Sequence, residues 1–283
     1  MSERFFVNDA LYGNFSFPTV IEELISSAPF QRLKAIHQGG AIFLVNPKIN
    51  HTRYDHSIGV YWLVTEFGGS IEERAAALLH DLSHTAFSHV VDYVLEKADE
   101  DYHEDIFNHV ISNSDIPDIL AKHGMSRVFD NFSDYNLLER PLPELCADRI
   151  DYTLRDLYQG DMITHKEISD FIEQLEVVEG RFRIAGDRAY SWFVKQYERL
   201  NKEYFRRPEY LFANHRLATI LKTAIGTGKI ALNELSGTDD QLISLLRQKG
   251  FETELDKISK LDGFESFDLK GAAKKLKVRK LTS

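Results

Sequence analysis

The chain is poor in cysteine and has no long hydrophobic run. Cys146 is the single cysteine among 283 residues, so no disulfide can form within the chain, and a reducing compartment suits it. The longest apolar runs, 41–45 and 75–79, are far shorter than the about 20 residues that cross a bilayer as a helix. The first residues, Met1–Phe5, contain no apolar signal segment. We therefore expect a soluble cytoplasmic protein with no membrane partner.

Positive charge is also scarce. The 34 lysines and arginines are outnumbered by 44 aspartates and glutamates, and the net charge of −10 argues against general adhesion to nucleic acid. An anionic substrate is still allowed, because a pocket needs only local cations and a metal. Residues 270–283, the basic tail, carry six basic residues and no acidic one. The simplest interpretation is that the tail is a solvated end of the chain. The alternatives are docking on a partner, a neighbouring subunit or a nucleotide phosphate, and weakly supported nucleic-acid binding.

Helical periodicity dominates the chain, and a hydrophobic content of 43% is enough for a sizeable core. The pattern predicts an all-α fold with one or two short β-hairpins. We expect one hairpin over 175–184, turning at Glu179-Gly180, and a β-prone link over 41–46. We divide the chain into a helical domain, 1–226, and an accessory C-terminal region, 227–283, that ends in the basic tail. Helices are expected over 19–36 with a break near Pro29, 52–67, 70–81, 85–98, 104–112, 116–123, 144–157, 189–204, 209–225 and 239–249.

Histidine is concentrated in one part of the chain. Eight of the eleven histidines lie between residues 37 and 109, where even spreading would place about three. His80, Asp81 and His84 lie within about one helical turn of each other, in largely apolar surroundings. Burying such a cluster is costly unless something pairs with it. Because imidazole nitrogens and carboxylate oxygens bind first-row metals, a divalent metal is the expected partner.

Other residues can complete a ligand set around His80 and Asp81. His56 lies on the preceding predicted helix, and Asp148 is the best-placed carboxylate on a later one. Two histidines and two aspartates form a mixed nitrogen and oxygen site. Such a site suits Mn, Fe, Co, Ni or Zn better than Mg, which prefers oxygen ligands.

The order His56, His80-Asp81, Asp148 resembles the H…HD…D pattern of the HD-domain metal-dependent phosphohydrolases. The flanking residues are similar to those of the dNTP triphosphohydrolase branch, which includes bacterial dGTPases and the mammalian SAM-and-HD-domain dNTPase. The resemblance covers roughly 30–225. It is carried by Arg53-Tyr-Asp-His56-Ser-Ile-Gly-Val, Leu79-His-Asp-Leu-Ser-His84-Thr-Ala-Phe-Ser-His89, Asp101-Tyr-His103-Glu104 and Asp148-Arg-Ile-Asp-Tyr152-Thr-Leu-Arg-Asp156.

This resemblance implies an HD-domain helical bundle, a homo-oligomer and a role for each matching residue. The implied reaction is metal-assisted hydrolysis at the α-phosphorus of a (deoxy)nucleoside triphosphate, which releases nucleoside and tripolyphosphate. The implied metal ligands are His56, His80, Asp81 and Asp148. The implied catalytic residues are His84 and His103 beside the scissile phosphate, with Glu104 supporting His103 as general acid. The implied substrate contacts are Arg53, Arg149 and Tyr152 to phosphate, Asp156 to the sugar, and Gln38 to its 3′ side.

The chain also departs from this branch. Ala213 stands where the branch usually carries a tyrosine that shapes the nucleoside pocket, and the chain is shorter than most members. Base and sugar selectivity are therefore open. The alternatives are a nucleoside monophosphatase, a guanosine tetraphosphate hydrolase, a phosphodiesterase, or a nucleotide sensor with low turnover. Arg53 and Arg149 have a structural alternative, ion pairs with Asp55 and Asp151.

Overall fold

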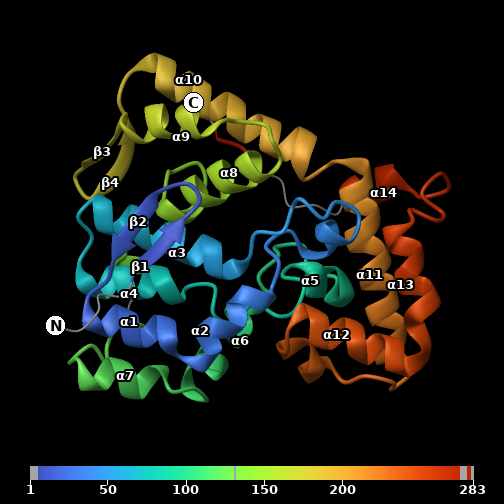
Figure 1. Cartoon of the computed structure of the whole chain (residues 1–283). Helices are drawn as coiled ribbons and strands as arrows, with labels where there is room; N and C mark the ends of the chain where they lie inside the picture. Colours follow the sequence, from blue (N-terminus) through green and yellow to red (C-terminus); the bar gives the residue numbers. More distant parts are fainter. Residues whose placement is uncertain (1–5, 131, 275–278, 282–283) are drawn as a thin grey trace.

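The computed structural model describes residues 6–130, 132–274 and 279–281, and its fold is helical apart from two small antiparallel hairpins (Figure 1). This confirms the predicted all-α class. None of the helices in these ranges is both long and apolar enough to span a membrane.

The first half of the chain supplies one hairpin and seven helices in the described residues. The predicted helix over 19–36 is broken at Ser27, and Pro29 stands in the first turn of the helix that follows, where it is tolerated. The elements are β1 (Phe6–Asp9), β2 (Gly13–Ser16), α1 (Thr19–Ser26), α2 (Ala28–Arg32), α3 (Arg53–Glu66), α4 (Ile71–Leu79), α5 (Val90–Leu95), α6 (Tyr102–Ser112) and α7 (Ile116–Lys122).

The second half begins with the helix that carries Asp148. Its hairpin over 175–184 is confirmed, and Glu179 and Gly180 adopt the left-handed φ values of +53° and +73° that a tight hairpin turn needs. The elements are α8 (Ala147–Gln159), α9 (His165–Ile172), β3 (Leu175–Val178), β4 (Arg181–Ile184), α10 (Asp187–Arg199), α11 (Pro208–Gly226), α12 (Asp239–Leu246), α13 (Glu252–Ser259) and α14 (Leu269–Lys274).

Helix α3 lies at the centre of the larger hydrophobic cluster, against α4 and α8. It begins with a capping box in which Thr52 and Asp55 satisfy each other's backbone N–H groups. Gly59 allows the close approach of α8, because a Cβ at this position would collide with the side chains of Asp151 and Arg155. The three elements that carry the predicted metal ligands are therefore neighbours.

A second hydrophobic cluster joins α5 and α11 to α12 and α13. Figure 1 shows these C-terminal helices gathered beside α11 and away from the α1–α4 region. The division of the chain at 226 and 227 stays a prediction. Within the basic tail, Lys275 and Lys277 lie outside the described residues, whereas Arg279 and Lys280 are described.

Two predicted elements are wrong. Residues 41–46 form no strand; Gly40–Leu44 is a short 3₁₀ helix whose Ala41 and Ile42 are buried. The single helix expected over 85–98 is only α5, because Phe87 and Ser88 adopt left-handed φ values of +60° and +52°.

The backbone N–H groups just before α5 form hydrogen bonds to the C-terminal region instead of to carbonyl groups of a preceding helical turn. The N–H of Ala86 donates to Leu235 O at 2.8 Å, and that of Phe87 to Asp239 Oδ1 at 2.6 Å. These long-range bonds satisfy donors that a helix would otherwise use. Tertiary contacts, invisible to local periodicity, therefore shape the loop between His84 and His89. The sequence pattern also did not predict the position of the N-terminal hairpin, β1–β2.

Candidate active site

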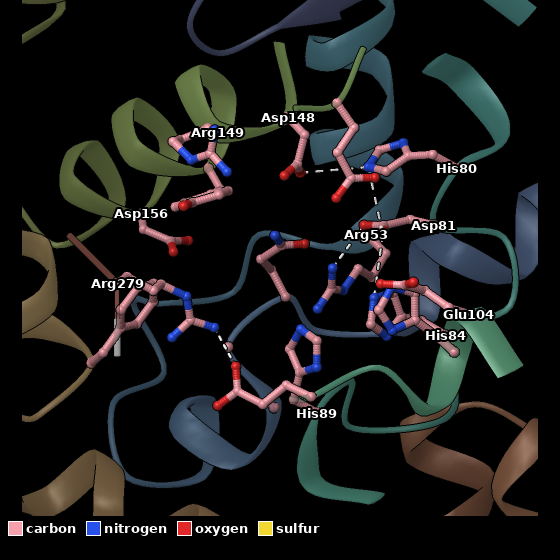
Figure 2. A pocket seen from close by; sticks show the side chains of 18 of the residues that line it. Arg53, His80, Asp81, His84, His89, Glu104, Asp148, Arg149, Asp156 and Arg279 are labelled. Carbon is pink, nitrogen blue, oxygen red and sulfur yellow. Dashed lines mark hydrogen bonds and ion pairs between the residues drawn. The ribbon is translucent and has the colours of Figure 1, made fainter. Parts of the chain in front are cut away.

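A cavity of about 620 Å³ runs between the two hydrophobic clusters and collects nearly all the predicted site residues (Figure 2). His56 is the exception, because it is fully buried behind the cavity wall. His80, Asp81 and Asp148 line one side of the cavity, and Figure 2 shows Asp156 across the cavity from His80. The predicted residues on the wall are Gln38, Arg53, His80, Asp81, His84, His103, Glu104, Asp148, Arg149, Tyr152 and Asp156.

The four predicted metal ligands converge on one point. Asp148 Oδ1 lies 3.0 Å from His56 Nε2 and 3.6 Å from His80 Nε2. The carboxylate of Asp81 lies 3.6 Å from His56 Nε2 and 3.5 Å from His80 Nε2. His80 Nε2 is buried and has no hydrogen-bond partner. An unpartnered imidazole nitrogen facing two carboxylates fits a divalent metal, and it would be unfavourable without one.

The other ring nitrogens orient these two histidines. His80 Nδ1 donates to Ala77 O at 2.8 Å, and His56 Nδ1 lies 2.7 Å from Asp151 Oδ2. Both contacts leave Nε2 for the metal and fix the ring plane, as is usual for metal-binding histidines. The sequence interpretation had considered Asp151 only as a partner of Arg149. Its spacing of four from Arg155 on one helix was the signal for its actual pairing.

A buried ionic network supports Asp151. Arg155 donates to both Asp151 carboxylate oxygens at 2.9 Å and to Asp9 Oδ2 at 3.0 Å. Arg155 is 1% exposed, so its charge depends on these two carboxylates. Asp9 ends β1, and it was not predicted because nothing local in the sequence indicates this contact. The N-terminal hairpin thus supports His56, a predicted metal ligand, through Arg155 and Asp151.

We expect metal binding to release a proton. Burial lowers the pKa of His56, but hydrogen bonds to Asp148 and Asp151 outweigh it and raise the pKa to about 10. The metal-free imidazole therefore carries a proton at neutral pH, whereas a ligand must be neutral. Affinity for Mn²⁺ should rise up to about tenfold per pH unit between about pH 6 and 8. Calorimetry in buffers of different ionisation enthalpy measures the proton count, and a pH-independent affinity would contradict this expectation.

The side of the cavity next to the ligands is built to receive an anion. Arg53 donates from Nη1 to Asp81 Oδ2 at 2.7 Å and from Nε to Ser88 Oγ at 2.9 Å. His84 and His103 stack with ring centroids 4.0 Å apart. Burial, followed by the charges of neighbouring groups, lowers the pKa of His84 well below its ordinary value and that of His103 to about 3. Both rings are therefore neutral beside the Arg53 cation.

His89, the last residue of the motif over 79–89, joins this group. Its ring packs edge-on against His84, at a centroid distance of 4.9 Å, and lines the cavity. Its Nδ1 lies 3.1 Å from Asp92 Oδ2. Three imidazoles thus face the space beside the metal ligands, where Figure 2 shows His89 below Arg53.

The ion pairs considered as the alternative for Arg53 and Arg149, with Asp55 and Asp151, do not form. Asp55 caps α3, and Arg53 pairs with Asp81. Arg149 donates to the carbonyl oxygens of Glu144 and, at 3.1 Å, Arg140, so it is bound to backbone while it lines the cavity.

The far end of the cavity presents oxygen and amide groups. Asp156 Oδ1 lies 2.6 Å from His51 Nε2, so the buried His51 positions this carboxylate. Tyr152 Oη lies 3.1 Å from Tyr197 Oη. Gln38 has a buried side-chain oxygen with no hydrogen-bond partner, and its backbone N–H donates to His51 O. Ala213 is buried on α11, with Leu211 and Asn214 beside it on the cavity wall.

Residues 53–156 match the sequence model of the HD domain. Metal-dependent phosphohydrolase cns2 of Cordyceps militaris is 32% identical over 254 residues, which cover 86% of this chain and 73% of that protein. The chain belongs to the HD-domain metal-dependent phosphohydrolases. Uncharacterized protein YdhJ of Bacillus subtilis shares 49% identity with this HD-domain phosphohydrolase over 85% of the chain and 75% of YdhJ.

More distant comparisons extend this relationship. Deoxynucleoside triphosphate triphosphohydrolase SAMHD1 of Danio rerio is 30% identical to this HD-domain phosphohydrolase over 141 residues, which cover 42% of the chain and 23% of SAMHD1. The crystal structure of a hypothetical protein from Aquifex aeolicus superimposes with a TM-score of 0.70 at 26% identity, covering 91% of this chain and 76% of that one. The chain therefore shares its fold with that protein over nearly its whole length, and the HD-domain match itself covers residues 53–156.

Proposed function

We propose that this HD-domain phosphohydrolase converts (deoxy)nucleoside triphosphates to nucleoside and tripolyphosphate. One observation carries the proposal: the predicted metal site opens into the same cavity as Arg53, the imidazole rings of His84, His89 and His103, and Asp156 at the end away from His80. A substrate with phosphates at one end and a nucleoside at the other matches this polarity. We further propose that it works in the cytoplasm as a homo-oligomer, on the basis of the family resemblance.

Each group in the cavity has a definite task in this reaction. A divalent metal (Mn, Fe, Co, Ni or Zn rather than Mg alone) held by His56, His80, Asp81 and Asp148 would supply charge neutralisation and activation of the attacking water. Arg53, oriented by Asp81 and Ser88, binds a phosphate oxygen with its guanidinium fork. Arg149 and Tyr152 contact the phosphates from α8. Asp156 accepts hydrogen bonds from the sugar. The side-chain amide of Gln38 can both donate hydrogen bonds to the sugar and accept them.

The leaving oxygen of the nucleoside requires a proton. His84 and His103 lie beside the space expected for the scissile phosphate, and Glu104 lines the cavity next to His103. His103 is neutral in the unliganded protein because of its lowered pKa. A bound polyanion favours the charged imidazole and so raises that pKa. His103, supported by Glu104, then donates the proton.

Replacing His103 with glutamine should lower kcat by about 10²- to 10⁴-fold, the usual contribution of general acid catalysis. The metal content should not change, since His103 is not a ligand. His89→Gln is the informative companion, because His89 is the second imidazole beside His84 and is paired with Asp92. If His89→Gln loses activity and His103→Gln does not, the proton donor is His89.

The test of the proposed function is a product-resolved assay of the purified protein. Deoxynucleoside triphosphates, nucleoside monophosphates, guanosine tetraphosphate and short oligonucleotides are incubated with Mn, Co, Ni, Zn, Fe or Mg. Nucleoside together with tripolyphosphate supports the proposal. Orthophosphate or pyrophosphate as the product would assign one of the other phosphohydrolase reactions. Binding of triphosphates without any product would indicate a sensor.

A further inference from the structure

One residue of the basic tail, Arg279, lies at the cavity. This arginine lines the cavity, and its side chain is only 18% exposed. It forms an ion pair with Glu100, and its guanidinium carbon lies 5.2 Å from the centroid of the Phe205 ring. Figure 2 shows Arg279 pointing into the cavity from the side opposite His80 and Asp148. Lys280, the next residue, is exposed. One tail residue is thus enclosed while its neighbour of the same charge is solvated.

The surroundings of Arg279 suit a flat heterocycle better than a phosphate. Glu100 balances the charge of Arg279, and Asp156 adds a second carboxylate to this end of the cavity, so a phosphate gains little here. Aromatic and aliphatic side chains provide the walls, and an apolar site with a few polar groups is typical of a nucleobase pocket. These wall residues are Tyr93, Tyr197, Phe205 and Leu211, with Asn214 beside them.

A guanidinium has five N–H donors in a planar fork, more than one carboxylate can accept. Adjacent O6 and N7 acceptors of a 6-oxopurine match two of these donors at once. Adenine carries an amino group next to N7. This amino group is a hydrogen-bond donor, so it cannot accept a second arginine N–H.

We propose that Arg279 is a specificity-determining residue that hydrogen-bonds to the O6 and N7 edge of a 6-oxopurine, so that the C-terminal segment forms a wall of the substrate cavity. This inference rests on the proposed function for placing the base, rather than the phosphates, at the end away from the metal. It adds a preferred base to that function and gives the basic tail a role in the active site.

The test compares Arg279→Gln and Arg279→Lys with Lys280→Gln, a matched control that removes one exposed positive charge from the same segment. Binding of deoxyguanosine and of deoxyadenosine is measured by equilibrium dialysis, and KM and kcat are measured for dGTP and dATP. In both Arg279 variants, the preference for deoxyguanosine over deoxyadenosine should fall about tenfold, the equivalent of one charge-assisted hydrogen bond. For dGTP, the Arg279 substitutions should raise KM and leave kcat nearly unchanged. Lys280→Gln should keep the preference.

Several results would overturn the inference: no deoxyguanosine binding by the native protein, an unchanged preference in Arg279→Lys, or equal losses for both nucleosides. If Arg279→Gln does not fold, Arg279→Lys still decides, because lysine keeps the charge beside Glu100 but cannot bind two acceptors with a planar fork. The nucleoside assay contains no phosphate. Arg279-dependent binding of deoxyguanosine without any triphosphate hydrolysis would therefore refute the proposed function and leave this inference standing.

Discussion

Substituting His80 with alanine should remove the metal and reduce kcat/KM by at least about 10³-fold, because a metal contributes several kcal/mol of transition-state stabilisation. His80 Nε2 faces Asp81 and Asp148, has no hydrogen-bond partner, and has its ring fixed through Nδ1 by Ala77 O. Elemental analysis of the dialysed protein, together with turnover in the product-resolved assay, measures both effects.

His109→Ala is the matched control for this substitution, since His109 lies exposed on α6 and bonds only locally to Asn113 in the described residues. It should keep full metal content and activity. A His80→Ala protein that retains stoichiometric metal would mean that the ligand set is misassigned. A protein that loses the metal but keeps its turnover would show that the chemistry does not need the metal.

Substituting Arg155 with methionine should lower the free energy of unfolding by about 3–5 kcal/mol, the usual cost of removing one partner from a buried ionic group. Asp9 would then be left as an uncompensated charge in the core, and Asp151 would keep only His56 as an ionic partner. Because Asp151 also orients His56, metal affinity should fall by about 10- to 100-fold in the same variant. Urea denaturation and a metal titration measure the two effects.

Arg247→Met provides the comparison on the surface. Arg247 also pairs with two carboxylates, Glu252 and Asp256, both at 2.9 Å, but it is exposed to solvent. Its substitution should leave the urea midpoint nearly unchanged, because exposed ion pairs contribute little. Equal midpoints for Arg155→Met and the native protein would show that the buried network is not a source of stability.

The candidate site was largely predictable from the sequence because its motifs are local. His80, Asp81 and His84 are close neighbours in the chain, and the strong helical patterns around His56 and Asp148 place both on helices. The packing of α3 against α4 and α8 brings these residues together, in agreement with the order of the motifs along the chain. Asp151 and Asp9 were less accessible to prediction. Their roles depend on contacts between segments far apart in sequence, such as the 146-residue separation of Arg155 and Asp9.

Local periodicity failed where distant segments take over backbone hydrogen bonds. Residues 85–98 contain enough helical signal for one helix, but Ala86 and Phe87 donate their N–H groups to Leu235 and Asp239. The same tertiary contacts leave His84 and His89 on a loop at the cavity wall. The apolar run at 41–45 was likewise compatible with a strand, and burial among helices made it a 3₁₀ turn.

The amino-acid sequence by itself determined the helical class and the membership of a phosphohydrolase family, and it predicted a four-residue metal site, because spacing along a helix and residue chemistry are local properties. Only the tertiary structure decided which side chains contact the predicted ligands, which arginine pairs with which carboxylate, and that Arg279 of the basic tail lines the cavity. These features depend on which distant residues become neighbours once the core is packed, and a charge is retained in the interior only where the fold brings it a partner.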